Sequence, residues 1–246
     1  MNSIFCRVGS KRYSAKDIIK YFPQHDKYVE PFVGSGAVFF RKEKIKNEVI
    51  NDLDKMLITA YKLLKSVTQP QFEEFKKLDT LKKKQAFINS NPTTTAGKLY
   101  KFIIQSCNTF SNSGKGKIYY NHSHFKKIKN IEEYKKRLRG TKILNQDYKR
   151  ILKSHDSPST LFYLDPPYEK SKGLYEDYSI DYEEMERVIR SLKGFVAISL
   201  NDSPKIRRIF KDYNIVKIDE IAGSRRIGKN FTSRIDILIM NYKLKK

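Results

Sequence analysis

Short apolar runs alternate with amphipathic stretches along most of the chain. Seven runs are mostly apolar, which predicts strands covered on both faces, as in a parallel sheet. These runs are residues 28–32, 48–52, 142–145, 161–164, 195–200, 215–218 and 235–242. Helical periodicity predicts helices over residues 14–22, 37–44, 55–66, 182–192 and 204–211. The alternation of strands and helices predicts an α/β fold with a doubly wound sheet.

The alternation stops between about residues 70 and 139. This Lys-rich stretch has helical periodicity in residues 72–88 and 96–107, followed by a polar, Gly-containing segment. Residues 113–116, Ser-Gly-Lys-Gly, have the composition of a turn that closes a hairpin. We therefore expect two domains, one formed by residues 1–69 and 140–246 and the other by a mainly helical insertion over residues 70–139.

A glycine turn follows the first predicted strand. The sequence from Glu30 to Gly36 reads EPFVGSG, and a predicted helix begins directly after it. Glycines allow a sharp turn and a close approach to a ligand, and the helix N-terminus adds a favourable dipole. The pattern is neither G-x-G-x-x-G nor a P-loop, so a cofactor without a phosphate grip fits it better. A plain turn between strand and helix remains the alternative.

Asp52 strengthens the functional interpretation of this turn. It ends the second predicted strand, and an acid at about this distance from a glycine turn commonly accepts hydrogen bonds from a ribose diol. The alternative role is an N-cap for the helix over residues 55–66, although Asp54 is better placed for that. A glycine turn, a ribose acid and no phosphate grip together suggest a nucleoside-type cofactor such as S-adenosylmethionine.

The tetrapeptide Asp165-Pro166-Pro167-Tyr168 ends the apolar run 161–164. Two consecutive prolines have fixed φ angles and donate no backbone hydrogen bonds, so the strand must stop at Asp165. Ligands of open α/β sheets bind at the carboxyl ends of strands. A carboxylate and carbonyl groups beside an aromatic ring suit a flat ligand with an exocyclic amine, such as a nucleobase. The alternative is a structural role for both residues, in which Asp165 caps a following turn and Tyr168 packs in the core.

Composition limits the partners of the chain. With 246 residues it is long enough for one core with a modest inserted domain. The net charge of +23 favours a polyanionic partner and salt-sensitive binding, although a Lys-rich composition alone would also raise the charge. The start of the chain lacks the long apolar stretch of a signal peptide, and no segment has the roughly 18 apolar residues of a membrane span. We therefore expect a cytoplasmic protein that has no contact with membranes.

The cysteines and histidines predict neither a disulfide nor a metal site. Cys6 and Cys107 lie far apart and have no metal-binding spacing, so we expect two reduced thiols. His122 and His124 form the one close histidine pair, and no cysteine or carboxylate cluster supports them as ligands.

The two motifs, in their order along the chain, resemble a known family. Residues 31–36 and 165–168, with the insertion between them, are similar to the DNA N6-adenine methyltransferases of the Dam type (D12 class, alpha group). The resemblance runs from about Arg7 to Tyr242. It implies a Rossmann-like, seven-stranded S-adenosylmethionine-dependent methyltransferase sheet and a target-recognition domain within residues 70–139. It also implies duplex DNA as substrate, a monomer or weak dimer, no metal, and a bacterial, phage or virus-infected host cell.

The resemblance assigns cofactor residues one by one. Arg7, Gly9 and Lys11 match an N-terminal motif, although the family usually has an aromatic residue in place of Arg7 and a glycine in place of Ser10. The turn is matched by Glu30, Pro31, Phe32, Gly34 and Gly36. The ribose acid and the residues beside the cofactor adenine are Asp52, Leu53, Asp147 and Tyr148, with Asp147 and Tyr148 expected to end the third strand. Asp165 is expected to contact the cofactor as well as the target.

The resemblance also assigns the target and DNA contacts. Asp165 and the Pro166 carbonyl would accept hydrogen bonds from the N6 amine of an extruded adenine, Pro167 would stiffen the turn, and Tyr168 would stack on the base. Asn, Lys, Tyr and Arg side chains are expected to contact DNA bases and phosphates. The candidates are Asn108, Asn112, Lys115, Lys117, Tyr119, Tyr120, Arg137 and Arg139 in the insertion, with Arg225 and Arg226 in a later loop. In this resemblance Asp236 stands where the family prefers Glu.

Several other functions remain open from the sequence. The same chemistry on RNA, or on the N4 amine of cytosine, is the nearest alternative, although a cytosine enzyme more often has Ser in place of Asp165. A non-catalytic nucleic-acid-binding protein with this fold is an alternative of another class, but it would not need Asp52, Asp165 and Tyr168 together. Nothing suggests a nuclease site. The enzyme is compatible with the modification half of a restriction–modification pair, without direct contact with the endonuclease.

Overall fold

A computed structural model describes residues 1–7, 9–109, 117–119, 128–168, 180–227 and 230–244, and of residues 219–234 it describes the backbone only. The helices are α1 (Ala15–Ile19), α2 (Ala37–Arg41), α3 (Lys55–Leu64), α4 (Gln69–Lys76), α5 (Leu81–Asn89), α6 (Thr95–Asn108), α7 (Ile131–Leu138), α8 (Tyr148–His155), α9 (Tyr182–Arg190) and α10 (Pro204–Ile209). The strands are β1 (Lys27–Glu30), β2 (Asn47–Asn51), β3 (Lys142–Leu144), β4 (Thr160–Leu164), β5 (Phe195–Asn201), β6 (Asn214–Ile227) and β7 (Asn230–Met240).

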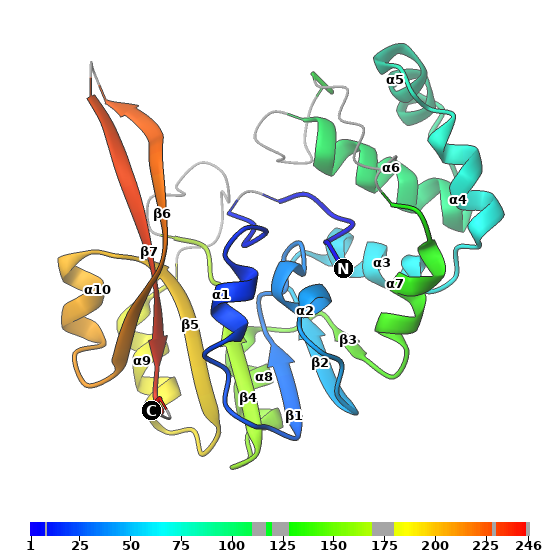
Figure 1. Cartoon of the computed structure of the whole chain (residues 1–246). Helices are drawn as coiled ribbons and strands as arrows, with labels where there is room; N and C mark the ends of the chain where they lie inside the picture. The colour runs from blue at the N-terminus through cyan, green and yellow to red at the C-terminus, as the bar shows by residue number, and fades with distance from the viewer. Residues whose placement is uncertain (8, 110–116, 120–127, 169–179, 228–229, 245–246) are drawn as a thin grey trace. The chain divides into compact units, whose positions relative to one another are not determined.

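The strands form one sheet with the order β3-β2-β1-β4-β5-β7-β6 (Figure 1). Strand β1 is parallel to β2 and β4, and β4 is parallel to β5. Strand β7 is antiparallel to both β5 and β6. Every residue of β4 is buried, as expected for a central strand covered on both faces. The predicted seven-stranded α/β sheet is therefore confirmed, with an antiparallel hairpin at one edge.

The hairpin is longer than the sequence predicts. Strand β6 continues from Asn214 to Ile227, whereas the apolar run that marks it covers residues 215–218 only. Beyond that run the pairing with β7 continues to Ile227, opposite Asn230, with register shifts on the way. Arg225 and Arg226 therefore lie in a strand, opposite Thr232 and Phe231, and the prediction that they lie in a loop is wrong. Figure 1 shows the two strands reaching past the rest of the sheet.

Contacts between Cα atoms divide the chain into two compact units. Unit 1 contains Met1–Arg12, Val33–Lys44 and Asp52–Asn145, and unit 2 contains Tyr13–Phe32, Ile45–Asn51 and Gln146–Lys246. Unit 1 includes helices α2 to α7, and unit 2 includes all the sheet strands except β3. Each unit has its own buried core.

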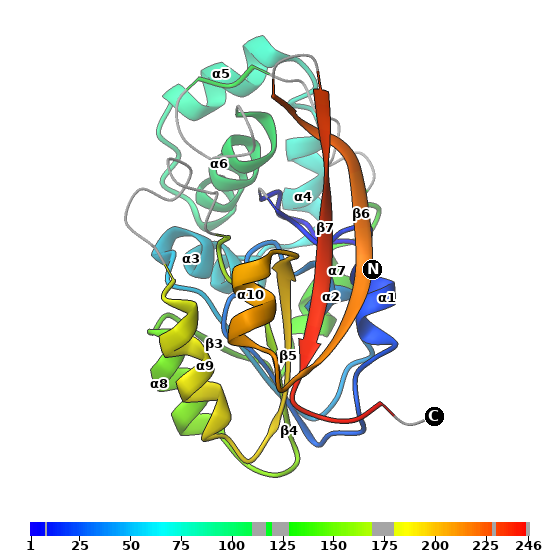
Figure 2. The same ribbon diagram turned by 90° about the vertical axis from the view of Figure 1, so that its left-hand side faces the viewer.

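In unit 2 the helices cover both faces of the sheet. Helices α8 and α9 lie on one face and α1 lies on the other (Figure 2). Helix α9 begins at Asp181, whose carboxylate accepts hydrogen bonds from the N–H groups of Glu183 and Glu184. Helix α8 was not expected from the sequence. It begins at Tyr148 with Asp147 as its N-cap, so these two residues start a helix and do not end the third strand.

In unit 1 the insertion is helical, but its first predicted helix is two helices. The chain leaves the helical conformation after α4, and Thr80 starts α5 by accepting a hydrogen bond from the Lys83 N–H. A threonine side chain that caps a new helix explains why one periodic stretch does not form one helix. Helix α7 was also not expected. The predicted hairpin at residues 113–116 lies outside the described residues.

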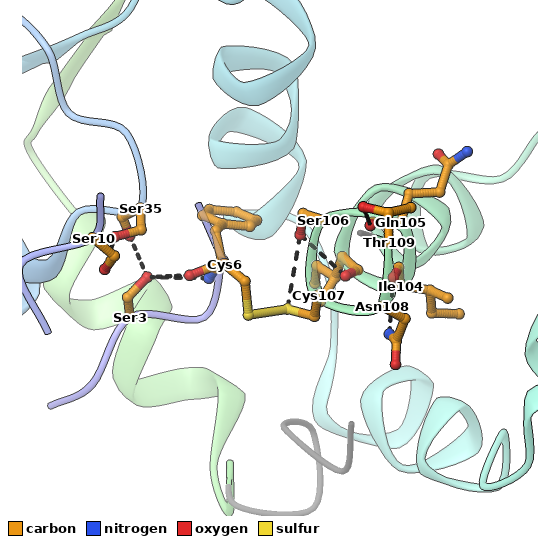
Figure 3. Close-up of a disulfide and its surroundings, with 12 residues drawn as sticks. Ser3, Cys6, Ser10, Ser35, Ile104, Gln105, Ser106, Cys107, Asn108 and Thr109 are labelled. Atoms are coloured by element: carbon orange, nitrogen blue, oxygen red, sulfur yellow. Dashed lines mark hydrogen bonds between the residues drawn. A yellow bond between two sulfur atoms is a disulfide. The ribbon is translucent and has the colours of Figure 1, made fainter. Parts of the chain in front are cut away.

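A disulfide bond joins Cys6 to Cys107, so the prediction of two reduced thiols is wrong. The two Cα atoms are 5.0 Å apart, and the bond links the N-terminal segment to α6 (Figure 3). Both sulfur atoms are brought together by packing, because Phe5 contacts the rings of Tyr61 and Phe102 edge-on. A separation of 101 residues gives no local sequence signal for such a pair.

Among the described residues, none of the helices combines the length and the apolar character that a membrane span requires.

Candidate active site

The site begins at one edge of the unit 2 sheet. Strands β2, β1 and β4 are parallel neighbours, so their carboxyl ends meet at the same edge. The chain passes from these ends directly into Asp52, Pro31 and Asp165, respectively. Three segments that the sequence singled out therefore start at the edge where open α/β sheets bind ligands.

Asn51 fixes the exit of β1, and sequence reasoning missed this residue. Its side-chain N–H groups donate to the Pro31 and Gln146 carbonyls, each over 2.9 Å, and its carbonyl accepts from the Gln146 N–H over 2.9 Å. The residue is buried, with 1% of its surface exposed. A single buried amide thus ties the exit of β1 to the chain that leads into α8. A polar residue at the end of a buried strand was the available signal.

The two glycines of the turn lie in unit 1. Gly34 and Gly36 have φ angles of 48° and 71°, which L side chains adopt only at a cost. The Gly36 N–H donates to the Val33 carbonyl over 2.7 Å, and α2 begins after Gly36. A Cβ atom at Gly34 would meet nothing within 4 Å, so the turn leaves open space on that side.

Asp52 bridges this turn to the start of α3. One carboxylate oxygen accepts from the Gly34 N–H over 2.9 Å, and the other accepts from the Asp54 N–H over 3.0 Å. Burial raises the pKa of the Asp52 carboxyl above its ordinary value, while these two hydrogen bonds act in the opposite direction. Asp54 is the N-cap of α3, as the sequence favoured, which leaves the position of Asp52 unexplained by capping. The hydroxyl of Tyr61 holds the other side of the turn by donating to the Gly34 carbonyl over 3.1 Å.

The N-terminal motif is bonded to the same turn. Arg7 forms an ion pair with Asp54 and lies over the ring of Phe102. The hydroxyl groups of Ser10 and Ser35 are 2.7 Å apart, so Ser10, which departs from the family pattern, bonds the turn directly (Figure 3).

Two further members of that motif lie close together. Lys11 is buried and donates to the carbonyl of Gly9 over 3.3 Å. Gly9 itself has a φ angle of 75°, and a Cβ atom there would also meet nothing within 4 Å.

Phe32 and Tyr148, two predicted neighbours of the cofactor adenine, contact each other in unit 2. Their ring centroids are 5.2 Å apart, and burial raises the pKa of Tyr148 to about 12. In unit 1, Leu53 has 41% of its surface exposed, which is unusual for a leucine that follows a buried strand. The first pair forms an apolar wall, and Leu53 presents an apolar side chain to solvent.

The segment of residues 165–168, called the target turn below, is held by two tyrosine hydroxyls. Tyr168 donates to a carboxylate oxygen of Asp236 over 3.3 Å, and Tyr182 donates to the Pro167 carbonyl over 2.8 Å. Asp165 and Tyr168 are half-buried, whereas Pro166 is buried. Sequence reasoning gave no role to Tyr182, and it treated Asp236 only as a family departure, because both partners are distant in the chain.

More buried polar groups lie beneath the sheet edge. The hydroxyl groups of Tyr163 and Ser199 are 2.8 Å apart, and Tyr28 donates to the Glu30 carboxylate over 2.6 Å. Burial, followed by the negative charge of Asp165, holds the pKa of Tyr163 well above its usual range. The Tyr163 hydroxyl therefore stays protonated at neutral pH.

The predicted DNA contacts divide into three groups. Asn108 and Arg137 are buried and bonded internally, to the carbonyls of Ile104 and Phe39, so their assignment to the DNA-facing surface is wrong. The exposed candidates are Lys117, Tyr119 and Arg139. Asn112, Lys115 and Tyr120 lie outside the described residues, and for Arg225 and Arg226 only the backbone is described.

Within the described part of the chain, no group of three or more His, Cys, Asp or Glu side chains is arranged to hold a metal ion. The pair His122 and His124 lies outside that part.

Comparison with known proteins gives a consistent result. A family model described as "D12 class N6 adenine-specific DNA methyltransferase" matches residues 8–223. The type II methyltransferase M.MjaIII of Methanocaldococcus jannaschii is 25% identical, and the alignment covers 88% of each chain. The type II methyltransferase M1.LlaDCHI of Lactococcus lactis subsp. cremoris is 24% identical, over 96% of this chain and 93% of that one. The DNA N-6-adenine-methyltransferase of Escherichia phage P1 is 23% identical over 85% of this chain and 31% of its own length.

Proposed function

The chain belongs to the D12 class of N6 adenine-specific DNA methyltransferases, and we propose that Asp165, Pro166 and Tyr168 hold an extruded adenine for methylation. As an enzyme of this class it methylates adenine in DNA. One observation carries the assignment of roles. The segments that contain the glycine turn, Asp52 and Asp165 all leave the sheet at the carboxyl ends of three neighbouring parallel strands.

The residues of the glycine turn fit S-adenosylmethionine, the cofactor that the family implies. Open space lies beside Gly34, and Asp52 presents a carboxylate that accepts hydrogen bonds. When bound, the cofactor supplies an electrophilic methyl group on a sulfonium. In the proposal, Asp52 accepts hydrogen bonds from its ribose diol, and Phe32, Leu53 and Tyr148 contact its adenine. The N-terminal motif with Arg7, Gly9 and Lys11 borders the same turn.

The chain's own residues position and polarise the target amine. The Asp165 carboxylate and the Pro166 carbonyl accept hydrogen bonds from the two N6 protons and direct the nitrogen lone pair away from the turn. They also stabilise the positive charge that develops on the nitrogen. Tyr168 stacks on the base, which contributes about 1–3 kcal/mol and offsets part of the unstacking cost of a few kcal/mol. Correct positioning of two reactants lowers a barrier by about 7–11 kcal/mol.

The insertion over residues 70–139 is proposed as the target-recognition domain. Its exposed candidates for DNA contacts are Lys117, Tyr119 and Arg139. The proposed set also includes Asn112, Lys115 and Tyr120, which lie outside the described residues, and Arg225 and Arg226. The net charge of +23 supports binding of the protein to DNA phosphates. The affinity for DNA is then expected to fall steeply as the salt concentration rises. We propose that the protein binds duplex DNA as a monomer or a weak dimer.

The biological context is proposed from the relatives. Two of them are named as type II methyltransferases. We infer that this enzyme protects DNA from a cognate endonuclease, which it need not contact because both read the same sequence.

One experiment tests substrate and site together. The wild-type protein and Asp165→Ala are incubated with methyl-labelled S-adenosylmethionine and either a random-sequence duplex DNA library or RNA. Modified bases are then identified by sequencing. We expect N6-methyladenine in one DNA sequence context, and a rate for Asp165→Ala that is at least about 100-fold lower. Methylation of RNA or of cytosine N4, or a wild-type rate in Asp165→Ala, contradicts the proposal.

A further inference from the structure

An acid interrupts the apolar strand β7 next to the target turn. Asp236 has 1% of its surface exposed, and the four residues that follow it, Ile237 to Met240, are fully buried apolar residues. A buried carboxylate costs several kcal/mol unless it receives hydrogen bonds, on the order of magnitude known for buried charges. An apolar residue would fill the same place in the strand without that cost. The acid therefore needs an explanation beyond packing.

The hydroxyl of Tyr168 supplies one of the hydrogen bonds that Asp236 accepts. The Oη–Oδ2 distance is 3.3 Å, which is longer than the usual distance of about 2.7–2.8 Å for an O–H···O bond. Hydrogen bonds in ligand-free active sites are often long and shorten when the substrate is bound. An ionised acceptor makes such a bond stronger than a neutral one. Asp236 thus holds the hydroxyl end of the ring whose face is proposed to stack on the adenine.

The backbone on the other side of Tyr168 is held independently. Tyr182, the first residue of α9 with 3% of its surface exposed, donates to the Pro167 carbonyl over 2.8 Å. This bond fixes the peptide that joins Pro167 to Tyr168. With the backbone fixed there, the remaining freedom of Tyr168 is rotation about its side-chain bonds, and a bond at Oη restricts that rotation.

We infer that Asp236 is a positioning residue for methyl transfer: its carboxylate orients the Tyr168 ring so that the extruded adenine stacks in the reactive position. This inference rests on the roles proposed for Asp165 and Tyr168. It adds a residue that acts through Tyr168 and does not itself touch the base. The ring would remain in place without Asp236, but its orientation would vary.

A double-mutant cycle tests the inference. Single-turnover rates are measured with saturating unmethylated plasmid DNA and methyl-labelled S-adenosylmethionine for wild type, Asp236→Asn, Tyr168→Phe and the double variant. Each single variant is expected to be about tenfold slower, and the double variant no slower than the slower single variant. Affinities for DNA and cofactor are expected to change less than about twofold, because the orienting bond acts after binding.

A matched control separates orientation from stability. Asp156 accepts hydrogen bonds from the N–H groups of Lys193 and Gly194 at the opposite edge of the sheet. Asp156→Asn is expected to lower the unfolding temperature without lowering the single-turnover rate of the folded protein.

Three outcomes decide between the ideas. If Asp236→Asn slows the Tyr168→Phe protein as much as it slows wild type, the inference is overturned. It is also overturned if Tyr168→Phe reacts at the wild-type rate, which decides the matter even where Asp236→Asn does not fold. A wild-type rate in Asp165→Ala contradicts the proposed function itself. If Asp165→Ala is inactive but the effects of Asp236→Asn and Tyr168→Phe on the rate are additive, only the role of Asp236 is contradicted.

Discussion

The glycine turn and the target turn are built in opposite ways. The glycine turn uses backbone conformations that other residues disfavour, at φ angles of 48° and 71°, and it keeps space open beside Gly34. The target turn uses two prolines and is held from outside by the hydroxyl groups of Tyr168 and Tyr182. The first is suited to admit a ligand close to the backbone. The second is suited to hold a side chain in one orientation.

The supports of the two turns differ as well. Around the glycine turn, the disulfide and the ion pair of Arg7 with Asp54 tie the N-terminal segment down. Around the target turn, neutral hydroxyl donors meet a carboxylate and a carbonyl. Substitutions in the first region should therefore act mainly on stability and cofactor affinity, and those in the second mainly on the rate.

Removal of the disulfide should have the largest effect on stability. Cys107→Ser frees a loop of about 100 residues in the unfolded chain, which the chain-entropy model values at about 4.7 kcal/mol, within a usual range of about 2–5 kcal/mol. Urea denaturation under non-reducing conditions measures the loss. Cys6→Ser is the control and should lose the same amount. Two variants as stable as wild type would show that the bond is absent in solution.

The two glycines should differ when each is replaced by alanine. At Gly36 a Cβ atom would lie 2.5 Å from the Tyr61 hydroxyl oxygen and 3.1 Å from the Phe40 ring, in addition to the unfavourable φ angle. Gly36→Ala should therefore cost about 2–4 kcal/mol of unfolding free energy.

Gly34→Ala is its matched partner, since only the φ angle opposes it. It should cost about 1–2 kcal/mol, and the added methyl group should weaken cofactor binding because it fills the open space. Thermal unfolding and calorimetric titration with S-adenosylhomocysteine measure both effects. Equal stability losses at the two positions would contradict the comparison.

Tyr182→Phe should affect the target turn and leave the glycine turn unchanged. It removes the bond to the Pro167 carbonyl, so it should lower the unfolding free energy by about 1 kcal/mol and reduce the methylation rate several-fold. Cofactor affinity should not change. Tyr163→Phe is the control, because it removes a buried bond to Ser199 and should cost similar stability with a smaller loss of rate. A loss of cofactor affinity in Tyr182→Phe alone would argue against separate roles.

Cofactor affinity should depend weakly on pH through Asp52. The ionised carboxylate accepts the proposed ribose hydrogen bonds, so affinity should fall as the pH falls through a pKa raised above the ordinary value of about 3.9. Because burial penalises the charged form, protonation of this group alone makes the fold more stable, so the loss of affinity is not caused by unfolding. Calorimetric titrations at a series of pH values from neutral downward, as far as the protein stays folded, measure it. Asp52→Asn should bind with an affinity that no longer changes over this range.

Much of the fold and of the two motifs could be predicted from the sequence, because both depend on local patterns. Apolar runs located all the strands, and glycine and proline marked the two turns. Several predictions that were wrong concern residues whose partners are distant in the chain. Cys6 meets Cys107 through ring packing around Phe5, which no spacing reveals. Asn108 and Arg137 are polar residues that are buried in the core, where they donate hydrogen bonds to backbone carbonyls.

The remaining misses concern a helix cap, the end of a strand and two hydrogen-bond donors or acceptors. The periodicity of residues 72–88 hid the cap at Thr80, which divides the stretch into two helices. Strand β6 continues past its apolar run because its partner β7 supplies hydrogen bonds that do not depend on side-chain polarity. Tyr182 and Asp236 lie 15 and 68 residues from the groups they hold, so only the folded structure connects them to the target turn.

The hairpin of β6 and β7 sets a length for the proposed contacts with a duplex. Strand β7 pairs with β5 only over Asp236–Met240, so residues 230–235 extend past the end of that pairing, where they pair with β6 and Ile235 still accepts a hydrogen bond from the Asp202 N–H. At about 3.4 Å per residue this two-stranded ribbon extends about 20 Å. That is the axial rise of about six base pairs at about 3.4 Å each. A two-stranded ribbon also has the width that the major groove of B-DNA admits. Arg225 and Arg226, which are proposed to contact DNA, lie on the projecting part, opposite Thr232 and Phe231.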